Sequence, residues 1–148
     1  MKLLHISDTH GHHRKLKLQE ADILVYTGDE SNQRSQFLNH TEFIDFFNWL
    51  SEVRGNFKRV LFVPGNHSTW IYHNEKEARR LFKSIDVDFL NKDEVVIDGI
   101  KFYGDPIMPR FGDWCYMTDR AKTVRHWDLI PTDVDVLLTH TPPKGVLD

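Results

Sequence analysis

Four short, largely apolar runs give this chain its most restrictive pattern. They cover residues 3–6, 23–26, 60–63 and 134–138, and each gives way to a glycine, a proline or a group of polar residues. Runs of this length that stay apolar at successive positions are typical of strands covered on both faces. Helix-like segments separate them, and strands that alternate with helices predict an α/β fold.

The segment between the second and third runs predicts a helix. Phe43, Phe46 and Leu50 recur at helical spacing, so they mark one apolar face. Asn39, with a glutamate three residues later, is the expected N-cap, and Gly55 is the expected stop. This helix fits the crossover connection that joins two parallel strands.

The pattern changes after the third run. A second helix is expected from Asn74, and then Asp98-Gly99 between two apolar runs predicts a β-hairpin. Residues 104–118 have no clean period and predict a long ordered loop, followed by a short helix over 119–127. We therefore expect an α/β sandwich whose second part is antiparallel.

Polar side chains with metal-binding chemistry follow all four runs. Ligands bind beyond the carboxyl ends of the strands in open α/β sheets, so these side chains are expected on one rim. They are two carboxylates, an amide and three imidazoles: Asp8, His10, Asp29, Asn66, His67 and His140. Oxygen and imidazole donors without a thiolate suit Mn²⁺, Fe, Zn²⁺ or Ni²⁺.

Each of these patterns alone is more often a turn or a helix cap than a ligand. Donors at four successive strand ends are a stronger signal, because their placement on one rim by chance is improbable. Gly28 and Gly65 precede the donors of the second and third runs and are expected to turn the backbone sharply there. Together these features predict a metal site.

The same residues resemble the calcineurin-like metallophosphoesterase superfamily over residues 2–148. The matching motifs are Asp8-x-His10, Gly28-Asp29, Gly65-Asn66-His67 and Thr139-His140. Two further stretches, 104–114 and 139–148, resemble its small single-domain phosphodiesterase branch, the metallophosphoesterase-domain-containing proteins. The resemblance implies one domain over 1–148 with a four-layer α/β/β/α sandwich, and two divalent metal ions side by side, with manganese the expected metal.

The resemblance also implies a role for each donor. Asp8 and His10 would hold the first ion, Asn66 and His140 the second, and Asp29 would bridge both. The substrate would be a small phosphodiester or phosphomonoester, such as a nucleotide, hydrolysed by a metal-activated water. His67 would assist the leaving group, with a supporting hydrogen bond as the alternative role.

Two features depart from the family pattern. Ser68 stands where the family usually has an acidic residue, so His67 is expected to be a weaker proton donor. The closing Gly-His-x-His motif and its strand are absent, so we expect a domain that is incomplete at its carboxyl end. Three explanations fit the absence of this motif: a fragment of a longer chain, a natural short form completed by a partner, and a chain with impaired catalysis. An uncovered sheet edge favours pairing with another chain.

The long loop supplies two candidate substrate-binding residues. Trp114 is expected either to stack on a nucleobase or to pack in the fold, and Arg110 to contact phosphate. The histidines at 12 and 13 are expected in a solvated basic run, with a reach to the rim as the alternative.

Composition narrows the class of protein. The net charge of −3 gives no strong nucleic-acid signal, and no apolar stretch is long enough to cross a membrane. The single Cys115 fits a reducing compartment, so a cytoplasmic location is expected. Two hypotheses follow: a metal-dependent phosphoesterase, and a binding or scaffold protein of the same fold with weak or no hydrolysis. The retained donors favour the enzyme.

Overall fold

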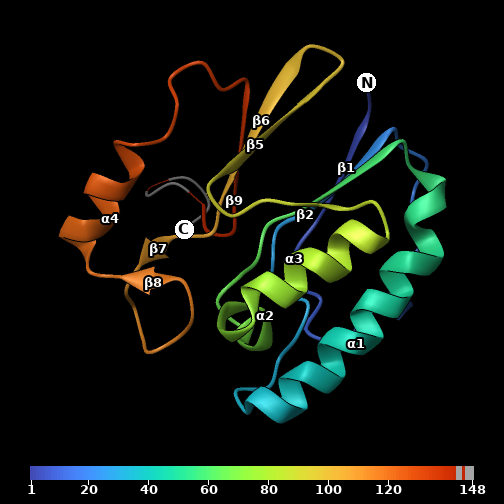
Figure 1. The fold of residues 1–148 in the computed structure, drawn as a ribbon, viewed down its shortest axis with the longest axis horizontal. Helices are drawn as coiled ribbons and strands as arrows, with labels where there is room; N and C mark the ends of the chain where they lie inside the picture. The colour runs from blue at the N-terminus through green and yellow to red at the C-terminus, as the bar shows by residue number, and fades with distance from the viewer. Residues whose placement is uncertain (143–144, 146–148) are drawn as a thin grey trace.

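The chain, described by a computed structural model at residues 1–142 and 145, contains two main sheets (Figure 1). The larger sheet comprises β1 (Leu3–Ile6), β2 (Ile23–Tyr26), β3 (Arg59–Phe62) and β4 (Asp88–Phe89). The smaller one comprises β5 (Asp93–Ile97), β6 (Ile100–Asp105) and β9 (Val136–Thr139). The α-helices are α1 (Gln36–Val53), α2 (Thr69–His73), α3 (Glu75–Ser84) and α4 (Arg120–Trp127).

The larger sheet is parallel throughout, in the order β1-β2-β3-β4. Helix α1 connects β2 to β3, and α2 and α3 connect β3 to β4, so both connections are crossovers. Figure 1 shows these three helices on one side of the sheet and the β5–β6 hairpin on the other. Parallel pairing brings the carboxyl ends of these strands to one rim, which is where the candidate donors begin.

The inner strands β2 and β3 of the larger sheet are buried on both faces, because their residues alternate between two cores. Leu24 and Tyr26 face α1, α2 and α3, where an aromatic cluster includes Phe43 and Phe46. Ile23 and Val25 point the other way and pack against the smaller sheet. The α/β prediction is confirmed.

Helix α4 lies beyond the smaller sheet and contacts the short strand β7 (Met108–Pro109), which pairs with β8 (Met117–Thr118).

The smaller sheet differs in one respect from the prediction. The hairpin is confirmed, with Asp98 and Gly99 both at positive φ between β5 and β6. Strand β9, however, pairs with β6 in parallel, so the second part is mixed rather than antiparallel. The reason is the long connection through α4, which returns the chain to the same end of the sheet before β9 begins.

Three local predictions were wrong. Asn39 is not the N-cap of α1, which begins at Gln36 and holds Asn39 inside as a buried residue. Strand β1 is not covered on both faces, because it is paired on one side only, with β2, and its residues alternate between exposed and half-buried. His13 is not solvated but buried against Phe46 and Trp49, with Nε2 on Asp45, whereas His12 is exposed.

The expected pairing of an uncovered sheet edge with another chain stays a prediction. The end of the 139–148 stretch lies outside the described residues. Among the helices of the described part of the chain, none is both long and apolar enough to cross a membrane.

Candidate dinuclear metal centre

Asp8, His10 and Asp29 converge at the ends of β1 and β2. The Nε2 atom of His10 lies 3.8 Å from Oδ1 of Asp8 and 3.9 Å from Oδ2 of Asp29. One ligand atom from each residue falls within 4.8 Å of the others, which is the spacing expected around a single ion. The first half of the predicted donor set therefore comes together in the structure.

Asn66 and His140 form a second pair, which reaches the same Oδ2 atom of Asp29 as His10 does. The Nε2 atom of His140 lies 3.1 Å from Oδ1 of Asn66 and 3.4 Å from Oδ2 of Asp29. Asn66 follows β3, and His140 follows β9 of the other sheet. Asp29 thus stands between two donor pairs, as a bridging carboxylate must.

Backbone carbonyls orient both imidazoles. Nδ1 of His10 lies 3.1 Å from the carbonyl oxygen of Ser31, and Nδ1 of His140 lies 2.6 Å from that of Thr27. A carbonyl oxygen only accepts, so each Nδ1 donates its proton and each Nε2 is the nitrogen that faces the rim, where it can bind a metal ion once it is deprotonated. Metal-ligating histidines are usually held in this way.

Electrostatics couple Asp29 to His140 in the buried part of the site. Burial alone would raise the pKa of Asp29, but the hydrogen bond and charge of His140 and the backbone N–H of His67 hold it below its usual value. Burial alone would lower the pKa of His140. The hydrogen bond and the negative charge of Asp29 outweigh this effect, so the pKa of His140 is raised. The pair therefore stabilises a carboxylate at the centre of the site.

Two glycines make room for this arrangement in different ways. Gly28 has a φ of +90°, so it provides the predicted turn before Asp29. Gly65 has no positive φ, although the predicted turn does follow it, with the N–H of Ser68 donating to the Gly65 carbonyl oxygen at 3.2 Å. Its need for glycine comes from close approach, because an added Cβ would lie 2.9 Å from Cε1 of His140 and closer still to the Asp29 carboxylate.

His67 lies next to the donors and is fixed on several sides. Its backbone N–H donates to Oδ1 of Asp29 at 2.7 Å, and its Nδ1 lies 3.0 Å from the carbonyl oxygen of Asn32. The edge of the His10 ring approaches it with centroids 4.9 Å apart, and the indole of Trp114 covers it at 4.0 Å. Since Nδ1 donates to a carbonyl, Nε2 is the nitrogen left for a substrate.

Asn39 supports the His67 loop and was missed as a site residue. Its amide nitrogen donates to the carbonyl oxygens of Gln33 and His67, both at 2.8 Å, and its Oδ1 accepts from the N–H of Trp70 at 2.8 Å. Asn39 is therefore a positioning residue, because its buried amide holds three backbone groups around the His67 loop by hydrogen bonds. In the sequence it looked like a cap because caps use the same side chain.

Glu30 was also missed, and it changes the view of Ser68. The Oγ atom of Ser68 donates to Oε2 of Glu30 at 2.6 Å and accepts from the N–H of Gly65 at 2.9 Å, and both side chains are fully buried. Burial raises the pKa of Glu30 to about 7. A carboxyl group is therefore present beneath the loop although position 68 itself is not acidic.

The two candidate substrate residues lie in the loop on the far side of His67. The Arg110 side chain is half exposed. Its Nη1 atom lies 3.7 Å from Oδ1 of Asp113, and its Nε atom lies 3.8 Å from Oδ1 of Asp119. Trp114 has His67 on one side, and the guanidinium of Arg34 lies 3.6 Å from its ring centroid. Arg34, five residues after Asp29, lies outside the predicted site, although that position could face a phosphate. Stacking of Trp114 on a nucleobase stays a prediction, and it would require Arg34 or His67 to leave the indole.

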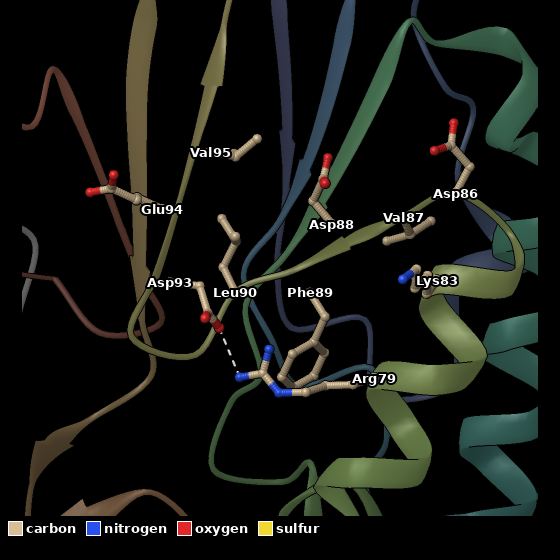
Figure 2. A pocket seen from close by; sticks show the side chains of 10 residues that line it. All are labelled: Arg79, Lys83, Asp86, Val87, Asp88, Phe89, Leu90, Asp93, Glu94 and Val95. Carbon is tan, nitrogen blue, oxygen red and sulfur yellow. Dashed lines mark hydrogen bonds and ion pairs between the residues drawn. The ribbon is translucent and has the colours of Figure 1, made fainter.

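A hollow of about 440 Å³ lies elsewhere, between α3, β4 and β5. Figure 2 shows Arg79 lying along the Phe89 ring and reaching Asp93, with a nitrogen–oxygen distance of 2.7 Å. None of the candidate donors lines this hollow, and its central arginine is already paired. The rim is the better candidate for chemistry.

The donor set fits divalent metal ions. It offers oxygen and imidazole ligands, a buried carboxylate near both histidines, and histidines whose Nε2 faces the rim, which suit Mn²⁺, Fe, Zn²⁺ or Ni²⁺. Each ion would receive three donors from the described residues, Asp29 being shared. The remaining coordination positions would be open to water and substrate oxygens.

Comparison with known proteins agrees with this geometry. The family model for calcineurin-like phosphoesterases matches residues 1–148. The chain is 29% identical to UPF0046 protein K07C11.7 of Caenorhabditis elegans over 100% of its own length and 53% of that protein. It is 28% identical to human metallophosphoesterase domain-containing protein 1 over 97% of its own length and 49% of that protein. It thus spans about half the length of these curated relatives.

A solved crystal structure shares the fold. The two superpose with a TM-score of 0.65 at 16% sequence identity, over 97% of this chain and 70% of the other. At that identity the likeness bears on the fold alone.

Proposed function

This chain belongs to the calcineurin-like phosphoesterase family, and from that premise we propose that it is a hydrolase that cleaves a phosphodiester or phosphomonoester with two divalent metal ions. One observation carries the proposal: the Asp29 carboxylate stands between the Asp8–His10 pair and the Asn66–His140 pair. A pure binding protein has no need for a buried bridging carboxylate with donors on both sides.

The bound ions would lower the pKa of a coordinated water and stabilise the charge on the phosphoryl oxygens. Asp8, His10 and Asp29 would hold one ion, and Asp29, Asn66 and His140 the other. Manganese is the metal we propose, because three of the five donors, Asp8, Asp29 and Asn66, offer carboxylate or amide oxygens, which suit it.

His67 would act on the leaving group. With its Nδ1 proton held by the Asn32 carbonyl, a protonated His67 can donate only from Nε2. Transfer of that proton to the leaving oxygen as the phosphorus–oxygen bond breaks would produce a neutral alcohol instead of an alkoxide. The stacked Trp114 and the Asn39 hydrogen bond to the His67 carbonyl fix the ring and the backbone for this step.

Hydrolysis of bis-p-nitrophenyl phosphate and p-nitrophenyl phosphate with added Mn²⁺ tests the proposal. We expect metal-dependent turnover by the chain, loss of it in Asp29→Ala, and normal turnover in Asp128→Asn, which changes an exposed aspartate at the end of α4. Turnover that Asp29→Ala leaves unchanged would refute the site. Two bound Mn²⁺ per chain without any turnover would instead support the binding or scaffold function.

A cytoplasmic location is part of the same proposal. The single Cys115 is consistent with a reducing compartment, where disulfides are rare. Expression of the tagged chain followed by cell fractionation would test it.

A further inference from the structure

Arg34 is an arginine held in place by stacking rather than by a charged partner. Its guanidinium carbon lies 3.6 Å from the Trp114 ring centroid, and the His67 ring lies 4.0 Å from the same indole. Two flat groups this close to one ring need opposite faces, since each covers most of a face. Trp114 therefore separates Arg34 from His67 by the thickness of one indole.

The charge of Arg34 is available to a ligand. Within the described part of the chain, its guanidinium forms neither a hydrogen bond nor an ion pair, whereas Arg79 pairs with two carboxylates and Arg54 with one. Its side chain is exposed. An unpaired guanidinium held over an indole at this distance has lost much of its side-chain freedom already, which lowers the entropic cost of binding an anion.

A pocket of about 450 Å³ opens beside this stack. Its walls include Arg34, Thr69, Tyr72, Arg110, Trp114 and Cys115. That volume is in the range of small-molecule sites. The lining also includes one carboxylate, Asp113, but its side chain is 99% exposed and lies 3.7 Å from Arg110, so it opposes Arg110 rather than Arg34.

The pocket lies where a leaving group would extend. In the proposed reaction the oxygen of a water forms a bond to phosphorus and releases its proton to solvent, the bond from phosphorus to the leaving oxygen breaks, and His67 protonates that oxygen. The leaving group therefore starts at His67. Trp114 borders both places, because its indole contacts the His67 ring and also lines the pocket, so a leaving group that passes the edge of the indole would reach Arg34.

We propose that Arg34 is a specificity-determining residue that binds a negatively charged leaving group, so that the preferred substrates are phosphodiesters whose leaving alcohol carries a phosphate or carboxylate. This inference rests on the proposed phosphoesterase function. Arg34 would form two parallel hydrogen bonds to the anion, the geometry that guanidinium and carboxylate or phosphate groups share. The products would be a phosphomonoester and an anionic alcohol.

Two synthetic diesters isolate this effect: methyl 4-carboxyphenyl phosphate and its carboxylate methyl ester, which differ by one negative charge on the leaving group. The measured quantity is the ratio of kcat/KM for the acid to that for the ester. Comparing this ratio between the chain and Arg34→Gln cancels the intrinsic reactivity of each diester. We expect Arg34→Gln to lower the ratio about tenfold, with the ester hydrolysed normally. Arg125→Gln, which changes an exposed arginine of α4 outside the pocket, should leave the ratio unchanged.

Binding of the same two compounds gives a readout that does not depend on turnover. Calorimetric titration of the Mn²⁺-loaded chain should show weaker binding of the acid, and not of the ester, in Arg34→Gln. Failure of bis-p-nitrophenyl phosphate hydrolysis would refute the phosphoesterase function alone, and the titration would still decide the role of Arg34. Equal binding of acid and ester, or an equal effect of Arg34→Gln on both, would overturn the inference.

Discussion

Asn39→Ala should destabilise the fold at the point where α1 supports the catalytic loop. The Asn39 side chain is fully buried and makes three hydrogen bonds of 2.8 Å, to Gln33, His67 and Trp70. All three partners are backbone groups of segments that flank the site. Removal of the amide would leave these groups without this partner in an interior from which water is excluded.

The size of the effect follows from the number of bonds. Each hydrogen bond contributes about 1 kcal/mol net, and a buried group left unsatisfied costs about 1–3 kcal/mol. Alanine recovers about 0.7 kcal/mol at most, because it is the better helix former. The expected loss is therefore about 3–5 kcal/mol, a large part of the roughly 5–15 kcal/mol that stabilises a domain of this kind.

Urea unfolding followed by far-UV circular dichroism measures this loss. The matched control is Asn48→Ala, which removes the same side chain from an exposed position of the same helix and should change the unfolding free energy by less than about 0.7 kcal/mol. A loss below about 1 kcal/mol for Asn39→Ala would show that the loop does not depend on this amide. The folded fraction of the variant should also have a lower kcat for diesters, because the His67 carbonyl is no longer held.

Three further outcomes are expected. Gly65→Ala should abolish Mn²⁺ binding measured by calorimetry, because the added Cβ overlaps the Asp29 carboxylate, whereas Gly55→Ala, with no atom within 4 Å of its Cβ, should bind normally. Burial lowers the pKa of His13, so the stability it contributes is full above pH 6.5 and falls at lower pH, and His13→Gln should remove this part of the pH dependence of urea unfolding without metal. Trp114→Ala should lower kcat for every ester if the indole positions its histidine neighbour, and raise KM for nucleotides alone if it stacks on a base.

The strands and the rim were predictable because each depends on local pattern. Apolar runs at successive positions identify strands buried on both faces, and parallel pairing then brings the residues after them to one edge. For this reason Asp8, Asp29 and Asn66 could be placed together before the fold was known. The hairpin at Asp98-Gly99 was predictable for a similar reason, since both residues tolerate positive φ.

The supporting residues were not predictable, because they depend on contacts between distant segments. Asn39 contacts residues 28 and 31 positions away, and a cap gives the same sequence signal. Glu30 looks like a polar residue of a turn until Ser68 is placed on it. Arg34 and Trp114 lie 80 positions apart in segments without a period, so nothing in the sequence indicates that they stack.

Backbone strain at the rim bears on the choice between enzyme and scaffold. Asp8, His10 and Asp29 have φ values of 55°, 44° and 57°, a left-handed conformation that costs about 1 kcal/mol for a residue with a side chain. Glycine would adopt it without that cost, and aspartate and histidine are among the types that tolerate it. All three residues lie in the loops that follow β1 and β2. If these residues served only as turns, glycine would be the more stable choice at all three positions. Their side chains are therefore best explained by the ligands they offer, which disfavours a scaffold that binds no metal.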